Sequence, residues 1–312
     1  MTTSSNDVFA LSAEKRGMGW LPSLPDIYDY TVDKSDLSPR LKSQGQDSIK
    51  GMLRRIGVAE PLKTLPLSVD LRAWCSPIED QGSLGSCTAN AGAGLVEYFE
   101  RRAFGRHIDA SRLFLYKATR NLSHWTGDTG AFLRTTMGAM VLFGVPPEEY
   151  WPYKIADFDK EPSAFCYAFG QNYQAISYYR LDPSGTSSVV LLERIKSNLA
   201  AGLPSMFGFT VYNSFYQAAS TGKIPFPSAG DGVAGGHAVV AVGYDDSIKI
   251  KNTVAGSVET KGALLIRNSW GPAWGGMGGY LWMPYDFVLK GLAVDWWSLL
   301  KNEWVETGQF KP

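Results

Sequence analysis

The pattern of apolar and polar positions divides the chain into three stretches. Residues 1–66 show no sustained period, and Pro22, Pro25 and Pro39 interrupt any long helix, which favours an extended arm. Within this arm a short helix is predicted over residues 48–57. Apolar positions recur at helical spacing from residue 67 to about 170, whereas after about 171 short β-branched and aromatic runs alternate with turn residues.

Helices followed by strands predict an α+β fold with two lobes and a cleft between them. Helices are expected over residues 86–105, 110–122, 130–144 and 187–202, and strands over 175–181, 205–211, 236–244, 262–268 and 278–284. Ser86 is expected to cap the first of these helices and Gly105 to end it. The strands are expected to form an antiparallel, barrel-like sheet, with an extended hairpin over residues 246–260.

The expected domain organisation follows from these boundaries. Residues 1–66 form the arm, and residues 67–312 form one domain with a helical lobe at about 75–170 and a β lobe at about 171–295. The arm contains aromatic side chains, among them Trp20 and Tyr28, which tend to pack against a surface.

Charge and hydropathy exclude several classes of partner. Thirty basic and thirty acidic side chains give no net charge, which argues against nucleic acid and anionic membrane surfaces. Mean hydropathy is −0.13, and no apolar run reaches the roughly 18 residues of a membrane helix. The first 20 residues lack a basic head followed by an apolar stretch, so we expect a cytoplasmic protein, with non-classical export as the other route.

Cysteine and histidine are scarce, which limits the sites that they can build. Three cysteines and three histidines give nine pairs, and none of the cysteines lies in a C-x-x-C motif. We therefore expect no metal site and no cofactor. His107 and His124 fall in polar stretches and are expected to be solvated.

Cys87 stands at the first turn of the predicted helix 86–105. Unpaired main-chain N–H groups and the helix dipole at this position favour a thiolate, and a thiolate is a nucleophile. Gln81, six residues upstream, is expected in a turn from which its amide reaches back towards the sulfur. Together with the N–H of Cys87 it supplies the two donors that an oxyanion needs.

His237 is the candidate base, because it opens a strongly apolar strand after two glycines. Asn268 ends another apolar strand, and its side-chain oxygen is positioned to orient an imidazole. Trp270 follows two residues later and is expected to shield that hydrogen bond from water.

These segments resemble the papain-like cysteine peptidases. Residues 81–89, QGSLGSCTA, match the family's Gln-Gly-Ser-Cys-Gly-Ser-Cys-Trp-Ala, and residues 236–238 match its His-Ala strand. Residues 268–275, NSWGPAWG, match its Asn-Ser-Trp-Gly-x-x-Trp-Gly. The three motifs occur in the family order and cover residues 67 to about 295. Leu84 replaces a family cysteine, Thr88 replaces the usual Trp, and the arm lacks the common helical propeptide pattern, as in prokaryotic members.

The resemblance implies a cysteine-type endopeptidase that acts through an acyl-enzyme. In that mechanism Cys87 and His237 form a thiolate–imidazolium pair, Asn268 orients the ring, and Gln81 binds the oxyanion. Peptide or protein substrates are the implied partners. The resemblance also implies that Gly85, Gly130, Trp270 and Trp274 contact the substrate, with Gly130 binding it as an extended strand.

Several alternatives stay open at this level. The arm either runs through the cleft as an intramolecular inhibitor or packs on the back of the fold. Cys75 and Cys166 form either a disulfide or two separate thiols. The chain is alternatively a catalytically idle peptide-binding relative or a Cys-dependent acyltransferase.

Overall fold

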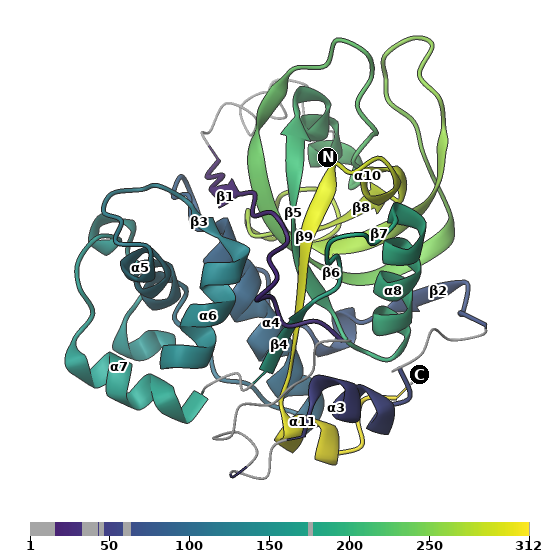
Figure 1. Cartoon of the computed structure of the whole chain (residues 1–312). Helices are drawn as coiled ribbons and strands as arrows, with labels where there is room; N and C mark the ends of the chain where they lie inside the picture. Colours follow the sequence, from purple (N-terminus) through teal and green to yellow (C-terminus); the bar gives the residue numbers. More distant parts are fainter. Residues whose placement is uncertain (1–15, 33–42, 44–46, 59–63, 174–176, 312) are drawn as a thin grey trace.

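The computed structural model describes residues 16–32, 43, 47–58, 64–173 and 177–311. Its elements form two lobes with the N-terminal arm between them (Figure 1). The α+β class is therefore confirmed.

The helical lobe is built around α4 (Cys87–Phe104), a long helix that also packs against the β lobe. Around it lie α5 (Arg112–Leu122), α6 (Leu133–Phe143) and α7 (Ala164–Gly170) (Figure 1). Gly105 ends α4 in the left-handed conformation, with φ 71°, as the sequence predicts. The expected Ser86 cap is wrong, because the Ser86 hydroxyl instead lies 2.6 Å from the Tyr153 hydroxyl and accepts from Asn90.

The β lobe is an antiparallel sheet of seven strands in the described part of the chain. Its strand order is β4-β9-β5-β6-β7-β8, and β2 also pairs with β6. The bounds are β2 Ser68–Asp70, β4 Ser177–Arg180, β5 Ser205–Tyr212, β6 Val233–Ile250, β7 Thr260–Arg267, β8 Tyr280–Pro284 and β9 Ala293–Leu300. One face is covered by α8 (Ser188–Ala200) (Figure 1).

The expected barrel-like closure is wrong, because β4 and β8 end the strand order without pairing with each other among the described residues. The long strand β6 pairs with β5 over its first half and with β2 and β7 over its second half, so the sheet coils but stays open. The extended hairpin expected between His237 and Asn268 is confirmed, since β6 continues to Ile250 and β7 begins at Thr260.

Strand β9 was not predicted, although it lies in the middle of the sheet between β4 and β5. Its Trp296 and Trp297 are fully buried. The chain then turns into α11 (Asn302–Glu306), where Trp304 stacks on Phe99 of α4 at 5.0 Å. The C-terminal segment thus connects the sheet to the central helix.

The arm contributes two elements, β1 (Trp20–Leu21) and α3 (Ile49–Arg55), the latter confirming the predicted short helix. The hydroxyl of Ser48 caps α3 by accepting from the Gly51 N–H at 2.9 Å. Strand β1 pairs in parallel with β3 (Ala131–Phe132). Residues 130–132, expected in a helix, therefore form an extended segment, and α6 starts only at Leu133.

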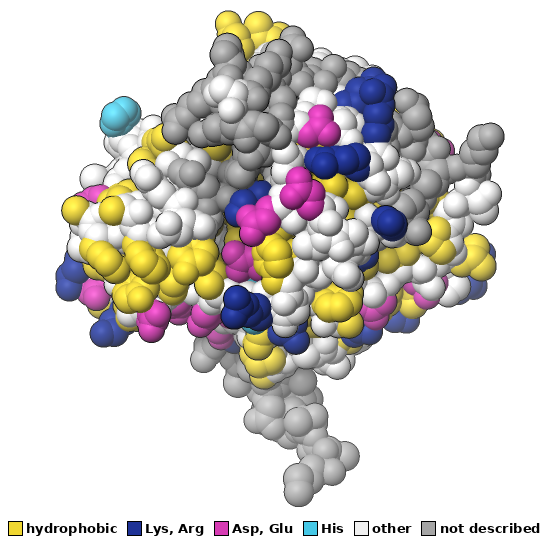
Figure 2. Space-filling view, turned by 90° about the horizontal axis from the view of Figure 1, so that it is seen from below, with side chains coloured by type: hydrophobic (Ala, Val, Ile, Leu, Met, Phe, Trp, Pro, Cys, Tyr) yellow, Lys and Arg dark blue, Asp and Glu magenta, His cyan; other side chains and the backbone are white. Residues whose placement is uncertain are grey.

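The remaining short elements connect these units. They are α9 (Ala218–Thr221), α10 (Asp286–Leu289) and the 3-10 turns η1 (Arg72–Trp74), η2 (Glu148–Tyr150), η3 (Ile155–Asp157), η4 (Gln171–Tyr173) and η5 (Asn213–Gln217). Seen from below, hydrophobic side chains gather on the helical lobe, to which the exposed Leu142 and Phe165 belong (Figure 2). This patch lies on the outer surface of the lobe.

All three cysteines, Cys75, Cys87 and Cys166, are buried and free, so the alternative of separate thiols holds for Cys75 and Cys166. No helix in the described ranges is long and apolar enough to cross a membrane. Within the same ranges no cluster of three or more His, Cys, Asp or Glu side chains is arranged to hold a metal ion.

Candidate active site

Cys87 is the first residue of α4 and is completely buried. Main-chain hydrogen bonds to its sulfur come from Ala238 and Thr88 of the body and from Gly19 and Trp20 of the arm. Burial raises the pKa of the Cys87 thiol to about 11, and these hydrogen bonds offset the effect only in part. The arm therefore covers the candidate nucleophile and keeps it protonated at neutral pH.

His237 lies on β6 opposite Phe209 of β5 and is also completely buried. Its Nε2 lies 2.8 Å from Oδ1 of Asn268, which is the contact expected from the sequence. The indole of Trp270 covers the imidazole with the ring centroids 4.9 Å apart. Burial lowers the pKa of His237 to about 4, against the opposing effect of the Asn268 hydrogen bond.

The second ring nitrogen of His237, Nδ1, is buried and has no hydrogen-bond partner among the described residues. Asn268 fixes Nε2, so Nδ1 is the nitrogen that remains to exchange a proton. With His237 neutral and the Cys87 thiol protonated, the covered site holds a thiol and an imidazole. The expected thiolate–imidazolium pair would form only after the site opens to water.

Gln81 is buried and its amide is held in one orientation. Oε1 accepts from the Ser269 hydroxyl at 2.5 Å, and the Gln81 main-chain N–H donates to the Ser269 carbonyl at 2.9 Å. Nε2 then donates to the carbonyl oxygens of Leu84 at 2.9 Å and of Gly17 at 3.1 Å. The donor that the sequence assigned to an oxyanion thus binds a carbonyl oxygen of the arm. Ser269 was not singled out from the sequence, although it lies inside the Asn-Ser-Trp motif.

Gly85 and Gly130 line the arm on the helical side. A methyl group on Gly130 would lie 2.2 Å from the Gly19 carbonyl oxygen, and that oxygen accepts from the Ala131 N–H at 2.7 Å. Gly130 has φ 74°, which favours glycine. A methyl group on Gly19 would in turn lie 1.9 Å from the Gly85 carbonyl oxygen. Both glycines therefore permit close approach of another chain.

Two side chains that sequence analysis missed hold these glycines. Asp128 accepts the Gly85 N–H at 3.0 Å and the Tyr116 hydroxyl at 2.6 Å. The same hydroxyl accepts the Gly130 N–H at 3.0 Å. Residues far apart in the chain meet here, so spacing alone gives no signal for them.

Trp270 and Trp274 are both buried, with their rings perpendicular and 4.9 Å apart. Trp270 Nε1 donates to the Gly17 carbonyl oxygen at 3.2 Å, so it contacts the arm directly. Trp274 stacks on Phe215 and supports Trp270 from behind. His107 and His124 lie elsewhere, partly buried and exposed respectively.

This arrangement combines a nucleophile, a base with an orienting amide, and an oxyanion donor in one cleft between two lobes. The family model described as papain family cysteine protease matches residues 65–289. The chain belongs to the papain family of cysteine proteases. As a member of this family, the protein is a cysteine peptidase.

Other papain-family proteins are similar over much of the chain. An uncharacterised peptidase C1-like protein of Acanthamoeba polyphaga mimivirus is 31% identical, over 92% of this chain and 88% of that protein. Chymopapain of Carica papaya is 26% identical, over 68% of this chain and 53% of its own length.

Solved structures show the same fold. Xylellain, a cysteine protease from Xylella fastidiosa, is 33% identical with a TM-score of 0.68 and covers 92% of this chain and 96% of its own. This is consistent with the expected likeness to prokaryotic members. Bromelain from Ananas comosus, at 19% identity and a TM-score of 0.55, covers 75% of this chain and 99% of its own and supports the fold alone.

Proposed function

We propose that the protein is an endopeptidase whose triad is Cys87, His237 and Asn268, and that its N-terminal arm inhibits it by occupying the active site. The observation that carries this proposal is the path of the arm past Cys87 and Gln81. Gln81 Nε2 donates to the Gly17 carbonyl oxygen, while main-chain hydrogen bonds from Gly19 and Trp20 reach the Cys87 sulfur.

The proposed chemistry begins when a substrate replaces the arm. His237 accepts the Cys87 proton at Nδ1, because Nε2 is already bound by Asn268. The sulfur attacks the peptide carbonyl carbon, and the resulting oxyanion accepts from Gln81 Nε2 and the Cys87 N–H. His237 then returns the proton to the leaving amine. Water, deprotonated by His237, releases the acyl group and restores the thiol.

The arm is fitted to the site along its whole described length. Gly17 N–H donates to the Gly82 carbonyl at 2.8 Å, and Arg16 pairs with Asp80 at 3.0 Å. Downstream, the Asp29 carboxylate binds Arg134 of α6 at 2.6 Å and Arg180 of β4 at 3.3 Å. Since these two arginines belong to different lobes, Asp29 fastens the arm across the cleft. The alternative in which the arm packs on the back of the fold has no support from these contacts.

Hydrolysis of an unstructured protein substrate such as casein by the full chain tests the proposed activity. We expect Cys87→Ala to abolish cleavage and the matched variant Cys166→Ala, which alters another buried free thiol, to retain it. Iodoacetamide mapping is expected to favour Cys87 over Cys75 once substrate has opened the site. Substrate binding without cleavage would instead identify an idle relative, and transfer of the acyl group to an added amine would identify an acyltransferase.

A further inference from the structure

Trp20 of the arm fills a side-chain pocket next to Cys87. It is 7% exposed, and a main-chain hydrogen bond joins it to the Cys87 sulfur. The indole lies on Gly208 of β5, where a methyl group would come within 1.8 Å of Cε2. A methyl group on Gly236 would lie 3.0 Å from Cε3. Two glycines thus leave a space of indole size in the β lobe.

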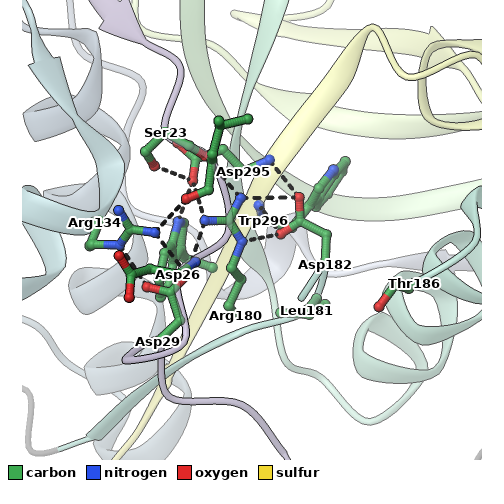
Figure 3. Close-up of polar contacts among 12 residues, drawn as sticks. Ser23, Asp26, Asp29, Arg134, Arg180, Leu181, Asp182, Thr186, Asp295 and Trp296 are labelled. Atoms are coloured by element: carbon green, nitrogen blue, oxygen red, sulfur yellow. Dashed lines mark hydrogen bonds and ion pairs between the residues drawn. The ribbon is translucent and has the colours of Figure 1, made fainter. Parts of the chain in front are cut away.

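A buried carboxylate lies at the end of this space. Trp20 Nε1 donates to Oδ2 of Asp295 at 3.2 Å (Figure 3). Asp295 is fully buried on β9, and its φ of 62° turns it out of the regular strand path. Its other oxygen, Oδ1, accepts from Ser23 Oγ at 2.9 Å and Trp297 Nε1 at 2.8 Å, and lies 3.3 Å from Arg180 Nη1.

Departure of the arm affects the two carboxylate oxygens differently. Oδ1 loses Ser23 but keeps Trp297 and Arg180. Oδ2 loses Trp20, the donor that the described residues give it. A buried acceptor without a partner costs about 1–3 kcal/mol. The vacated pocket therefore requires a new donor at Oδ2.

The charges around the pocket indicate which donor fits. Once the arm leaves with Asp29, the body retains two cations and two anions, namely Arg134, Arg180, Asp182 and Asp295 (Figure 3). This group is balanced, since Arg180 binds Asp182 at 2.9 Å and lies beside Asp295. A cationic side chain would bring an uncompensated charge into a buried site, which is costly. A neutral aromatic donor carries no such cost.

We propose that the Trp20 pocket is a substrate specificity pocket for a neutral aromatic side chain with an N–H donor, tryptophan in the first place, and that Asp295 is the specificity-determining residue. The inference rests on the proposed peptidase function, because it names the substrate class of that same site. Phenylalanine fills the space without satisfying Oδ2, and arginine satisfies Oδ2 with an excess positive charge.

A matched substrate pair tests the inference on the full chain. Fluorogenic peptides with Trp moved one position at a time locate the preferred position, at which Trp is then replaced by 3-benzothienylalanine. This residue has sulfur in place of the indole N–H and otherwise similar shape. We expect kcat/KM to be about tenfold higher for Trp, and higher for Trp than for Arg. Competition from the arm scales both values by the same open fraction, so their ratio is unaffected.

Two variants link this preference to Asp295. Asp295→Asn removes the charge, and Asn tolerates a positive φ; we expect the Trp to benzothienylalanine ratio to fall below about threefold. Arg134→Gln is the matched control, because it alters the same charged group without a hydrogen bond to Trp20 or Asp295 among the described residues, and its ratio is expected to stay as in the wild type. Equal hydrolysis of the two peptides by the wild type, or preference for Arg, would overturn the inference.

Failure of the proposed function has a different signature. If no peptide is cleaved, the peptidase proposal fails, and the pocket is tested by binding instead. The same two peptides are then compared for protection of Cys87 against iodoacetamide. Protection at lower concentration by the Trp peptide supports the inference, whereas equal protection contradicts it.

Discussion

The side-chain Nε2 of Gln81 donates to the carbonyl oxygen of Gly17 at 3.1 Å, although 64 residues separate the two in the chain. Trp270 Nε1 donates to the same oxygen at 3.2 Å. A carbonyl oxygen of the arm thus takes both donors at the point where the proposed reaction places its oxyanion. The inhibited state uses the enzyme's own hydrogen-bond donors.

Ser269 is predicted to be a positioning residue for Gln81. Ser269→Ala removes the hydroxyl that donates to Oε1 at 2.5 Å, so the amide is no longer held with Nε2 towards the reacting carbonyl. Loss of a whole oxyanion donor lowers kcat about 100-fold or more, and disorientation of one is expected to lower it about tenfold. The check is kcat at saturating peptide, where substrate has displaced the arm, with KM changed less than about threefold.

The matched control for this variant is Ser247→Ala, on the distant exposed hairpin. A purely structural role for Ser269 would lower thermal stability and leave kcat per folded molecule unchanged, and that outcome would refute the positioning role.

Asp29 is predicted to hold the arm in place. Asp29→Asn breaks buried ion pairs with Arg134 and Arg180, which together span the two lobes. Breaking such pairs costs a few kcal/mol, and part of that cost falls on closure of the arm. We expect kcat/KM to rise about tenfold or more through a lower KM with kcat unchanged, since the variant only enlarges the open fraction.

Asp70→Asn provides the control for Asp29→Asn, because Asp70 pairs with Arg72 in an exposed ion pair away from the arm. Equal KM values for wild type and Asp29→Asn would show that this contact does not hold the arm closed.

The covered pair also predicts how stability depends on pH. Burial lowers the pKa of His237 from 6.5 to about 4, so the folded state prefers the neutral ring. This contribution is present above pH 6.5 and is lost as pH falls towards 4. Burial raises the pKa of Cys87 from 9.0 to about 11, so its contribution is present below pH 9 and is lost as pH rises through 11.

Unfolding in urea at a series of pH values checks this prediction. The acid loss attributable to His237 is on the order of 3 kcal/mol, and it is expected to vanish in His237→Gln when that variant is compared with wild type. Cys87→Ala is expected to reduce the alkaline loss in the same way. Parallel pH profiles for wild type and both variants would contradict the proposed protonation states.

The site could be predicted from sequence wherever its chemistry lies in a continuous motif. Cys87, His237 and Asn268 each carry local signals, and the structure joins His237 to Asn268 as expected. The contacts of Ser269 with Gln81 and of Trp20 with Asp295 span 188 and 275 residues. Such pairs arise only from the packing of the two lobes, so no periodicity or spacing announces them.

Strand β9 and the open sheet were missed for related physical reasons. Asp295 places a charged residue in the middle of an apolar run, and the pairing of β5 with β9 shifts register between Met206 and Gly208. The run therefore lacks the alternation of an ordinary strand. Strand pattern alone also does not distinguish a closed barrel from a coiled open sheet, because closure depends on which strands meet at the ends.

Gly19→Ala tests most directly whether the arm inhibits the enzyme. A methyl group at residue 19 would lie 1.9 Å from the Gly85 carbonyl oxygen, so the arm cannot seat while the body stays unchanged. Leu24→Ala, which alters a side chain of the same arm that is 86% exposed, is the matched control. The measurement is the rate of Cys87 alkylation by iodoacetamide together with kcat/KM for a peptide substrate. The account predicts that both rise at least tenfold in Gly19→Ala and stay at the wild-type level in Leu24→Ala; unchanged values in a folded Gly19→Ala protein would contradict it.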